Sequence, residues 1–249
     1  MFKLPANKPQ VPVDTPRNFF FYGATMSGKS YLANEFPNPI ILNTDGNASA
    51  NSVPAIQLVN EKDQSGRITK SVIEQLSEIL LALQTQKHTY ETVVVDVIDM
   101  IKIAVCGHFG VKALSEVPYG KASDYFNQAL TELVIDLKSL PVNVIYISRE
   151  VSIYDEKGKV IEKVPSLKEK YVNLINGNSD LMIRTEKLGN NYNREVVRKR
   201  KTYKSDQIDD KEILKILQTI DGAVVMTSKT TKTKPAEKKQ ETAAEEDIF

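Results

Sequence analysis

A glycine-rich octapeptide near the start of the chain has the residue types and spacing of a phosphate-binding loop. Its residues are Gly23, Ala24, Thr25, Met26, Ser27, Gly28, Lys29 and Ser30, which match the pattern G-x-x-x-x-G-K-[ST] at every fixed position. Glycine lets backbone N–H groups turn toward phosphate oxygens, and the helix that follows presents its positive N-terminal end to the same anion. We expect Lys29 to contact the β- and γ-phosphates of ATP, and the Ser30 hydroxyl to bind Mg²⁺. The pattern is expected by chance in about 1% of chains of this length.

A nucleotide site of this kind needs a second metal-binding carboxylate at the end of a neighbouring buried strand. Asp96 directly follows the β-branched run Val93-Val94-Val95 and is our candidate Mg²⁺ ligand, either directly or through water. The alternative is an ordinary strand-end Asp that caps the next helix. Asp99 follows closely and is more typical of a helix start.

Hydrolysis also requires a group that orients the attacking water. Asp45 ends the second predicted strand and is our candidate base; the alternative is a turn-forming Asp. Val97 follows Asp96, so the Asp-Glu pair of many motor ATPases is absent. Ser148 ends the fourth predicted strand and is either a γ-phosphate sensor or a plain strand-end hydroxyl. The predicted catalytic set is therefore Lys29, Asp45, Asp96 and Ser148.

The elements that must position these groups alternate between strand and helix over residues 18–150. Apolar strands are predicted at 19–22, 39–43, 92–96 and 142–148, and helices at 30–35, 71–84, 99–110 and 122–140. The strands are continuously apolar rather than alternating, which indicates a parallel sheet covered on both faces. The sequence therefore predicts an α/β fold with a mainly parallel central sheet flanked by helices.

The second half of the chain carries signals of antiparallel strands. Segments 151–154 and 160–164 flank a charged turn, and segments 181–184 and 195–198 flank a Gly-Asn-Asn turn. Two C-terminal hairpins are therefore expected, followed by a short helix at 210–220.

The chain is predicted to form one folded core between two irregular ends. An irregular N-terminal lead-in occupies 1–17 and the core 18–226, within which the polar segment 47–70 has no assignment. The Thr/Lys/Ala/Glu-rich segment 227–249 lacks apolar periodicity, and we expect a disordered tail there.

Composition excludes several classes of protein. One cysteine and two histidines in 249 residues rule out an internal disulfide and disfavour a His/Cys metal site. No apolar run approaches the about 20 residues needed to span a bilayer, and the N-terminus lacks the apolar core of a signal peptide. We therefore expect a cytoplasmic protein without membrane contact. The 33 Lys+Arg and 32 Asp+Glu give a net charge of +1, which excludes a uniformly basic surface but not a local patch.

The order of several segments carries a family resemblance. They are the phosphate loop, Asn43-Thr44-Asp45-Gly46, the strand ending at Asp96, Pro118-Tyr119-Gly120-Lys121-Ala122-Ser123-Asp124-Tyr125, Ile147-Ser148-Arg149-Glu150 and Pro165-Ser166-Leu167. In this order the chain resembles the phage-encoded AAA-type nucleotide-binding proteins, which are RecA-like core ATPases. Some of these act as single-strand annealing proteins in phage recombination. The resemblance covers roughly residues 15 to 205, and only the phosphate loop is a highly specific part of it.

The resemblance implies a RecA-like P-loop NTPase fold, ATP with Mg²⁺, single-stranded DNA as a partner, homo-oligomers and a location in the host cytoplasm. Asp45 stands where RecA itself has a water-activating Glu, and the shorter side chain implies slow hydrolysis. Many relatives have His after the fourth-strand Ser, where this chain has Arg149.

A strongly basic segment is the candidate DNA-binding surface. Binding of single strands needs cations at phosphate spacing and planar groups for base stacking. The segment offers Arg194, Arg198, Lys199, Arg200, Lys201, Tyr203 and Lys204. The alternatives are an edge strand whose charges protect it from aggregation, and an arginine finger that completes the ATP site of a neighbouring subunit.

The last residues carry acidic charge followed by apolar side chains. Asp247, Ile248 and Phe249 resemble the acidic tip of bacterial single-strand-binding proteins and are candidate partner-docking residues. The alternative is a solubilising disordered tail.

Two functions remain open at this stage. The first is a RecA-like phage recombination ATPase that binds single-stranded DNA and promotes annealing or strand exchange. The second is a nucleotide-binding accessory protein of phage replication or packaging. It would act with little hydrolysis through a protein partner, such as a single-strand-binding protein or a host replication protein.

Overall fold

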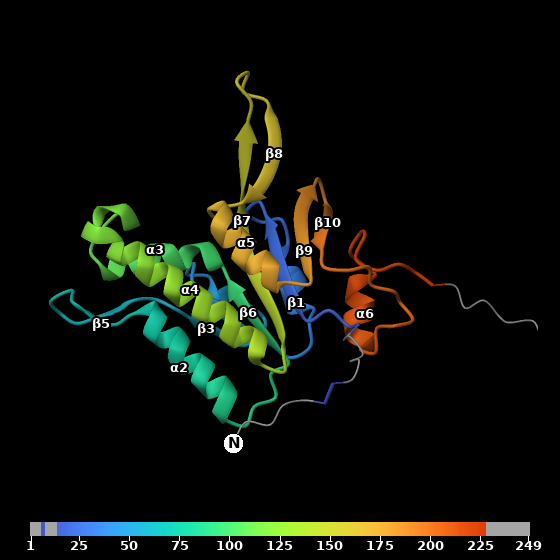
Figure 1. Cartoon of the computed structure of the whole chain (residues 1–249), viewed down its shortest axis with the longest axis horizontal. Coiled ribbons are helices and arrows are strands. Elements are labelled where there is room, and N and C mark those ends of the chain that lie inside the picture. The colour runs from blue at the N-terminus through green and yellow to red at the C-terminus, as the bar shows by residue number, and fades with distance from the viewer. Residues whose placement is uncertain (1–5, 8–13, 228–249) are drawn as a thin grey trace, which may run out of the picture.

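A mainly parallel sheet forms the centre of the protein in the computed structural model, which describes residues 6–7 and 14–227 (Figure 1). The strand order is β10-β9-β1-β7-β6-β2-β3, with β8 paired to β7 outside this path. Strands β9, β1, β7, β6, β2 and β3 are parallel, whereas β10 is antiparallel to β9. The strands are β1 (Asn18–Gly23), β2 (Pro39–Asn43), β3 (Ala55–Gln57), β6 (Thr92–Asp96), β7 (Asn143–Tyr154), β8 (Val160–Pro165), β9 (Leu181–Leu188) and β10 (Asn191–Lys199).

Helices cover both faces of this sheet, which confirms the predicted α/β class. They are α1 (Lys29–Asn34), α2 (Val72–Thr85), α3 (Ile101–His108), α4 (Lys121–Ser139), α5 (Glu169–Asn178) and α6 (Lys211–Leu217). Strand side chains alternate between two cores because successive residues of a strand point to opposite faces. The α1-side core contains Phe21, Val94 and Ile147 with Leu32 of α1 and Ile213 of α6. The α4-side core contains Tyr22, Val95 and Tyr146 with Leu76 of α2, Leu130 of α4 and Ile175 of α5.

Local sequence explains where α2 begins. Ser71 Oγ accepts a hydrogen bond from Glu74 N, and the Glu74 carboxylate accepts one from Ser71 N, so the two residues form a capping box.

One helix was not predicted from the sequence, and one segment was left without an assigned structure. Helix α5 was not predicted, although Tyr171 and Ile175 are four residues apart and both are buried. The unassigned segment 47–70 contains the short helix Ala48–Ala50, strand β3, and the small hairpin of β4 (Glu61–Lys62) and β5 (Ile68–Lys70).

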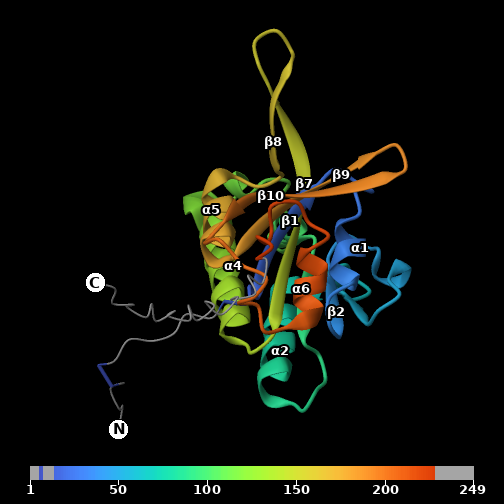
Figure 2. The ribbon, with the colours of Figure 1, turned by 90° about the vertical axis from the view of Figure 1, so that its right-hand side faces the viewer.

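Both predicted hairpins are present and extend beyond the body of the sheet. Strand β7 is buried over its first six residues and then continues, without a loop, into a hairpin with β8. This β7–β8 arm (residues 150–165) projects from the molecule in two views (Figures 1 and 2). Strand β9 pairs with β10 as predicted and is in addition the parallel neighbour of β1, so the second hairpin belongs to the central sheet.

The segment after α6 folds back onto β10 and the residues that follow it. Val196 N donates to Asp221 O at 2.9 Å, and Val225 N donates to Tyr203 O at 2.8 Å. Apart from Thr227, the predicted tail lies outside the described residues, and so do Asp247, Ile248 and Phe249. Within the described part of the chain, no helix has the length and apolarity needed to cross a bilayer.

Candidate nucleotide site

The glycine-rich loop joins the end of β1 to the start of α1 at the carboxyl edge of the parallel strands. Gly28 has a φ of 91°, in the left-handed region that glycine adopts without strain. Lys29 is buried, and its Nζ donates to Gly23 O at 2.8 Å and Ala24 O at 2.7 Å. Burial lowers the pKa of Lys29, whereas the nearby Asp96 carboxylate raises it. The amine therefore lies inside the loop, in the place expected for a phosphate ligand.

Close packing explains why the first residue of this loop must be glycine. A Cβ at Gly23 would lie 2.3 Å from Thr185 O and 2.6 Å from Ser27 Oγ. Thr185 belongs to β9, and its hydroxyl is 2.7 Å from Ser27 Oγ. The loop is thus held against the neighbouring strand as well as by its own helix.

The predicted metal ligands Ser30 and Asp96 are brought together by the fold. Ser30 Oγ donates to Asp96 Oδ2 at 2.6 Å, and Asp96 is 5% exposed. Burial raises the pKa of Asp96, the Ser30 hydrogen bond opposes this shift, and the Asp45 charge adds to it. Two adjacent hard oxygen atoms fit Mg²⁺, which typically takes one or two protein ligands together with water and phosphate oxygens. Residues 6–7 and 14–227 hold no cluster of three or more His, Cys, Asp or Glu residues able to bind a metal.

Asp45 lies at the same edge of the sheet. It follows β2, whose last residue Asn43 pairs with Asp96 of β6, and its side chain is exposed. Thr44 fixes this junction: its N donates to Asp96 O at 2.8 Å, and its hydroxyl donates to Val97 O at 2.6 Å. The sequence did not single out Thr44, because a strand-end Thr carries no distinctive signal.

Ser148 is fully buried, and its hydroxyl donates to Arg149 O at 3.1 Å. Along β7, Tyr146 belongs to the α4-side core and Ile147 to the α1-side core. Strand alternation therefore turns Ser148 toward the α4 side, away from the face that carries α1 and Asp96. Ser148 pairs with Tyr22, the residue before the phosphate loop, but its side chain lies on the opposite face of the sheet from α1.

Tyr192 of β10 lies against the phosphate loop. A Cβ at Gly28 would be 2.8 Å from Tyr192 Cδ1. The residues from Met26 to Tyr31, together with Tyr192, line a cavity of about 530 Å³. Tyr192 was not among the predicted site residues, because nothing in the sequence indicated that β10 would reach the loop.

The predicted DNA-binding residues do not form a single face. Arg194 contacts Glu35 at the end of α1 through Nη1 at 3.0 Å and Nη2 at 2.6 Å. Arg200 Nη2 donates to Gly177 O and Ser179 O at the end of α5, at 2.6 and 3.0 Å. These two arginines therefore hold the fold together.

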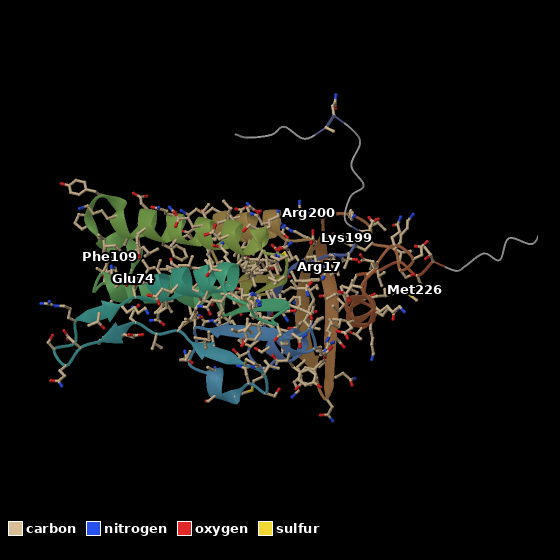
Figure 3. The ribbon with its side chains drawn as sticks, turned by 90° about the horizontal axis from the view of Figure 1, so that it is seen from below. Arg17, Glu74, Phe109, Lys199, Arg200 and Met226 are labelled. Carbon is tan, nitrogen blue, oxygen red and sulfur yellow. The ribbon has the colours of Figure 1, made fainter. Side chains whose placement is uncertain are left out.

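The rest of the segment lies near the opposite edge of the sheet. Lys201 Nζ donates to Asp14 at 2.6 Å, and Tyr203 is 3% exposed, so its ring is not free to stack on a base. Arg198, Lys199 and Lys204 are exposed. Arg17, which precedes β1, lines a cavity together with Arg200 and Lys201, and the labelled Arg17 and Arg200 lie at the same side of the molecule in Figure 3.

The parallel sheet, the phosphate loop and the Ser30–Asp96 pair together define a P-loop nucleotide-binding protein. The sequence matches the AAA domain family over residues 15–211, so the chain belongs to this family and is a P-loop ATPase.

Solved structures with partial similarity include two proteins with low sequence identity. One is the RadB recombinase, with 16% identity and a TM-score of 0.42, covering 75% of this chain and 83% of that chain. The other is the flagellar accessory protein FlaH from Methanocaldococcus jannaschii, with 12% identity and a TM-score of 0.34, covering 74% and 80%. Comparison with curated proteins gave no match.

Proposed function

We propose that this ATPase is a RecA-like recombination protein of the phage-encoded type, which binds single-stranded DNA as a homo-oligomer and promotes annealing or strand exchange. Strand β10 is the observation that supports this proposal. Its first half contacts the phosphate loop through Tyr192 and the C-terminal end of α1 through Arg194, and its end presents the exposed Arg198 and Lys199. A change in the nucleotide bound at Gly28 can therefore alter the positions of the basic residues, because one strand joins the two places.

In this proposal ATP binding, ATP hydrolysis and DNA contact are each assigned to residues described above. Lys29 and the loop N–H groups bind the phosphates, and Ser30 with Asp96 holds Mg²⁺, which supplies charge neutralisation at the phosphates. Asp45 orients the attacking water from the exposed end of β2. DNA phosphates contact Arg198, Lys199 and Lys204, and the contact is electrostatic.

Binding of fluorescent single-stranded DNA with ATP, ADP or no nucleotide tests this function. The wild type is expected to bind more tightly with ATP and to lose affinity steeply as salt rises, since each neutralised phosphate releases a counterion. Lys29→Ala should lose the response to ATP while keeping its fold.

A paired substitution separates DNA contact from general charge. The Arg198→Ala/Lys199→Ala variant should bind DNA more weakly and show a shallower salt dependence. The Lys62→Ala/Arg67→Ala variant removes the same charge from the β4–β5 hairpin and should bind like the wild type. A DNA affinity that changes with neither nucleotide nor salt would reject the proposal. It would favour an accessory protein that acts through a protein partner.

A further inference from the structure

Asp99 and Arg149 form an ion pair beside the ATP site that has no role in the mechanism above. Asp99 lies in the short helix Ile98–Met100 that follows β6, and its side chain is 3% exposed. Arg149 Nε donates to Asp99 Oδ2 at 2.7 Å. A buried carboxylate is costly unless a cation pairs with it, so Arg149 stabilises Asp99, and Asp99 in turn fixes the direction of the guanidinium.

The strand register places Arg149 at the centre of the site. Strand β7 lies between β1 and β6, and Arg149 pairs directly with Gly23, the first residue of the phosphate loop. On the other side of β7, Ile147 pairs with Asp96. Because Arg149 is two residues beyond Ile147, strand alternation turns it toward the α1 side, the face that Ser148 does not share.

The charges around Lys29 agree with this placement. The Asp99 carboxylate raises the pKa of Lys29, and the Arg149 guanidinium lowers it, so both charges are close enough to act on this amine. Glu150 also raises this pKa, but it is paired with Arg184 at 2.7 Å.

The guanidinium of Arg149 keeps donors available for a ligand. Its Nε is used by Asp99, and its Nη2 is 3.0 Å from Met100 Sδ, a weak acceptor. Within the described residues, Nη1 donates no hydrogen bond, and the Arg149 side chain is 44% exposed. An arginine held through Nε presents its two Nη groups as a fork, which matches the oxygen spacing of a phosphate.

We propose that Arg149, oriented by Asp99, contacts the terminal phosphate of bound ATP within the same subunit and lets the site distinguish ATP from ADP. Arg149 is then a substrate-binding residue, and Asp99 is a positioning residue. This role replaces the sensor role predicted for Ser148. The inference rests on the ATP site alone, so it stands or falls independently of DNA binding.

Calorimetric titration with ATP and with ADP, both in the presence of Mg²⁺ and without DNA, tests the contact. Arg149→Ala should weaken ATP binding by about 10- to 100-fold, the effect of losing one charge-assisted hydrogen bond, and change ADP binding by about twofold or less. Arg67→Ala removes an exposed arginine from the β4–β5 hairpin and should leave both affinities unchanged.

Two further variants protect the test from misfolding and separate the two residues. Arg149→Gln keeps an amide donor for Asp99 and should also lose the preference for ATP. Asp99→Asn should reduce the ATP/ADP affinity ratio in the wild type but not in the Arg149→Ala background, because a positioning residue acts only through its partner. Equal losses of ATP and ADP affinity in both Arg149 variants, or an unchanged ratio, would overturn the proposal.

Discussion

Replacing Gly28 by alanine tests whether Tyr192 packs against the phosphate loop. The φ of Gly28 is 91°, and the new Cβ would lie 2.8 Å from Tyr192 Cδ1. Gly66, in the β4–β5 turn, has a φ of 82° and no atom within 4 Å of the position of its Cβ. Gly66→Ala is therefore a control with the same backbone strain and no collision.

The expected cost follows from these two geometries. Each alanine should destabilise the fold by about 1–2 kcal/mol through its left-handed backbone. Gly28→Ala should lose about 1 kcal/mol more, because the Tyr192 ring must move; this is the low end of overpacking costs, since the ring is half exposed. The extra loss corresponds to a Tm about 2–4 °C below that of Gly66→Ala.

Thermal and urea unfolding followed by circular dichroism measures this difference. Adding Tyr192→Ala to Gly28→Ala should recover the extra loss, whereas adding it to Gly66→Ala should recover nothing. Equal stability of the two glycine variants, or no recovery in the double variant, would refute the contact between Tyr192 and the loop.

Three further outcomes are expected. Asp45→Ala should bind ATP as the wild type does but lose turnover in a phosphate-release assay; surviving turnover would remove Asp45 as the base. Asp96→Asn should raise the Tm of the nucleotide-free protein, because it removes a buried charge, and should abolish Mg²⁺-dependent hydrolysis; a lowered Tm would argue against a destabilising carboxylate. Arg184 and Lys163 lower the pKa of Glu186 to about 2, so its stabilising effect is full above the usual Glu pKa and is lost as the pH falls toward 2. Glu186→Gln should therefore cost about 1 kcal/mol at pH 7 and nothing near pH 2 in unfolding experiments, and a loss that persists near pH 2 would contradict this.

Much of the fold follows from local patterns in the sequence. Continuous apolar runs such as Val93-Val94-Val95 indicate parallel strands buried on both faces, and the loop motif fixes the junction of β1 and α1. The proximity of Ser30 and Asp96 could be predicted because a Mg²⁺ site requires a motif and a strand end, both of which are visible in the sequence.

The remaining features depend on contacts between distant segments. Tyr203 lies in a basic run, yet its ring belongs to the α1-side core. Arg194 and Arg200 look like DNA ligands until their partners on α1 and at the end of α5 are known. Whether Ser148 or Arg149 faces the α1 side of the sheet depends on which face of β7 packs against α1. A strand pattern alone does not show this.

Strand β7 has a mechanical consequence. Arg149 stands where the strand leaves the sheet, and β7 continues from it without a loop to Tyr154, near the tip of the β7–β8 arm. Five residues of extended chain make a rigid lever of about 17 Å. A rotation of about 10° at the sheet edge would move its tip by about 3 Å, so a small displacement at the ATP site is magnified at the outer surface of the protein.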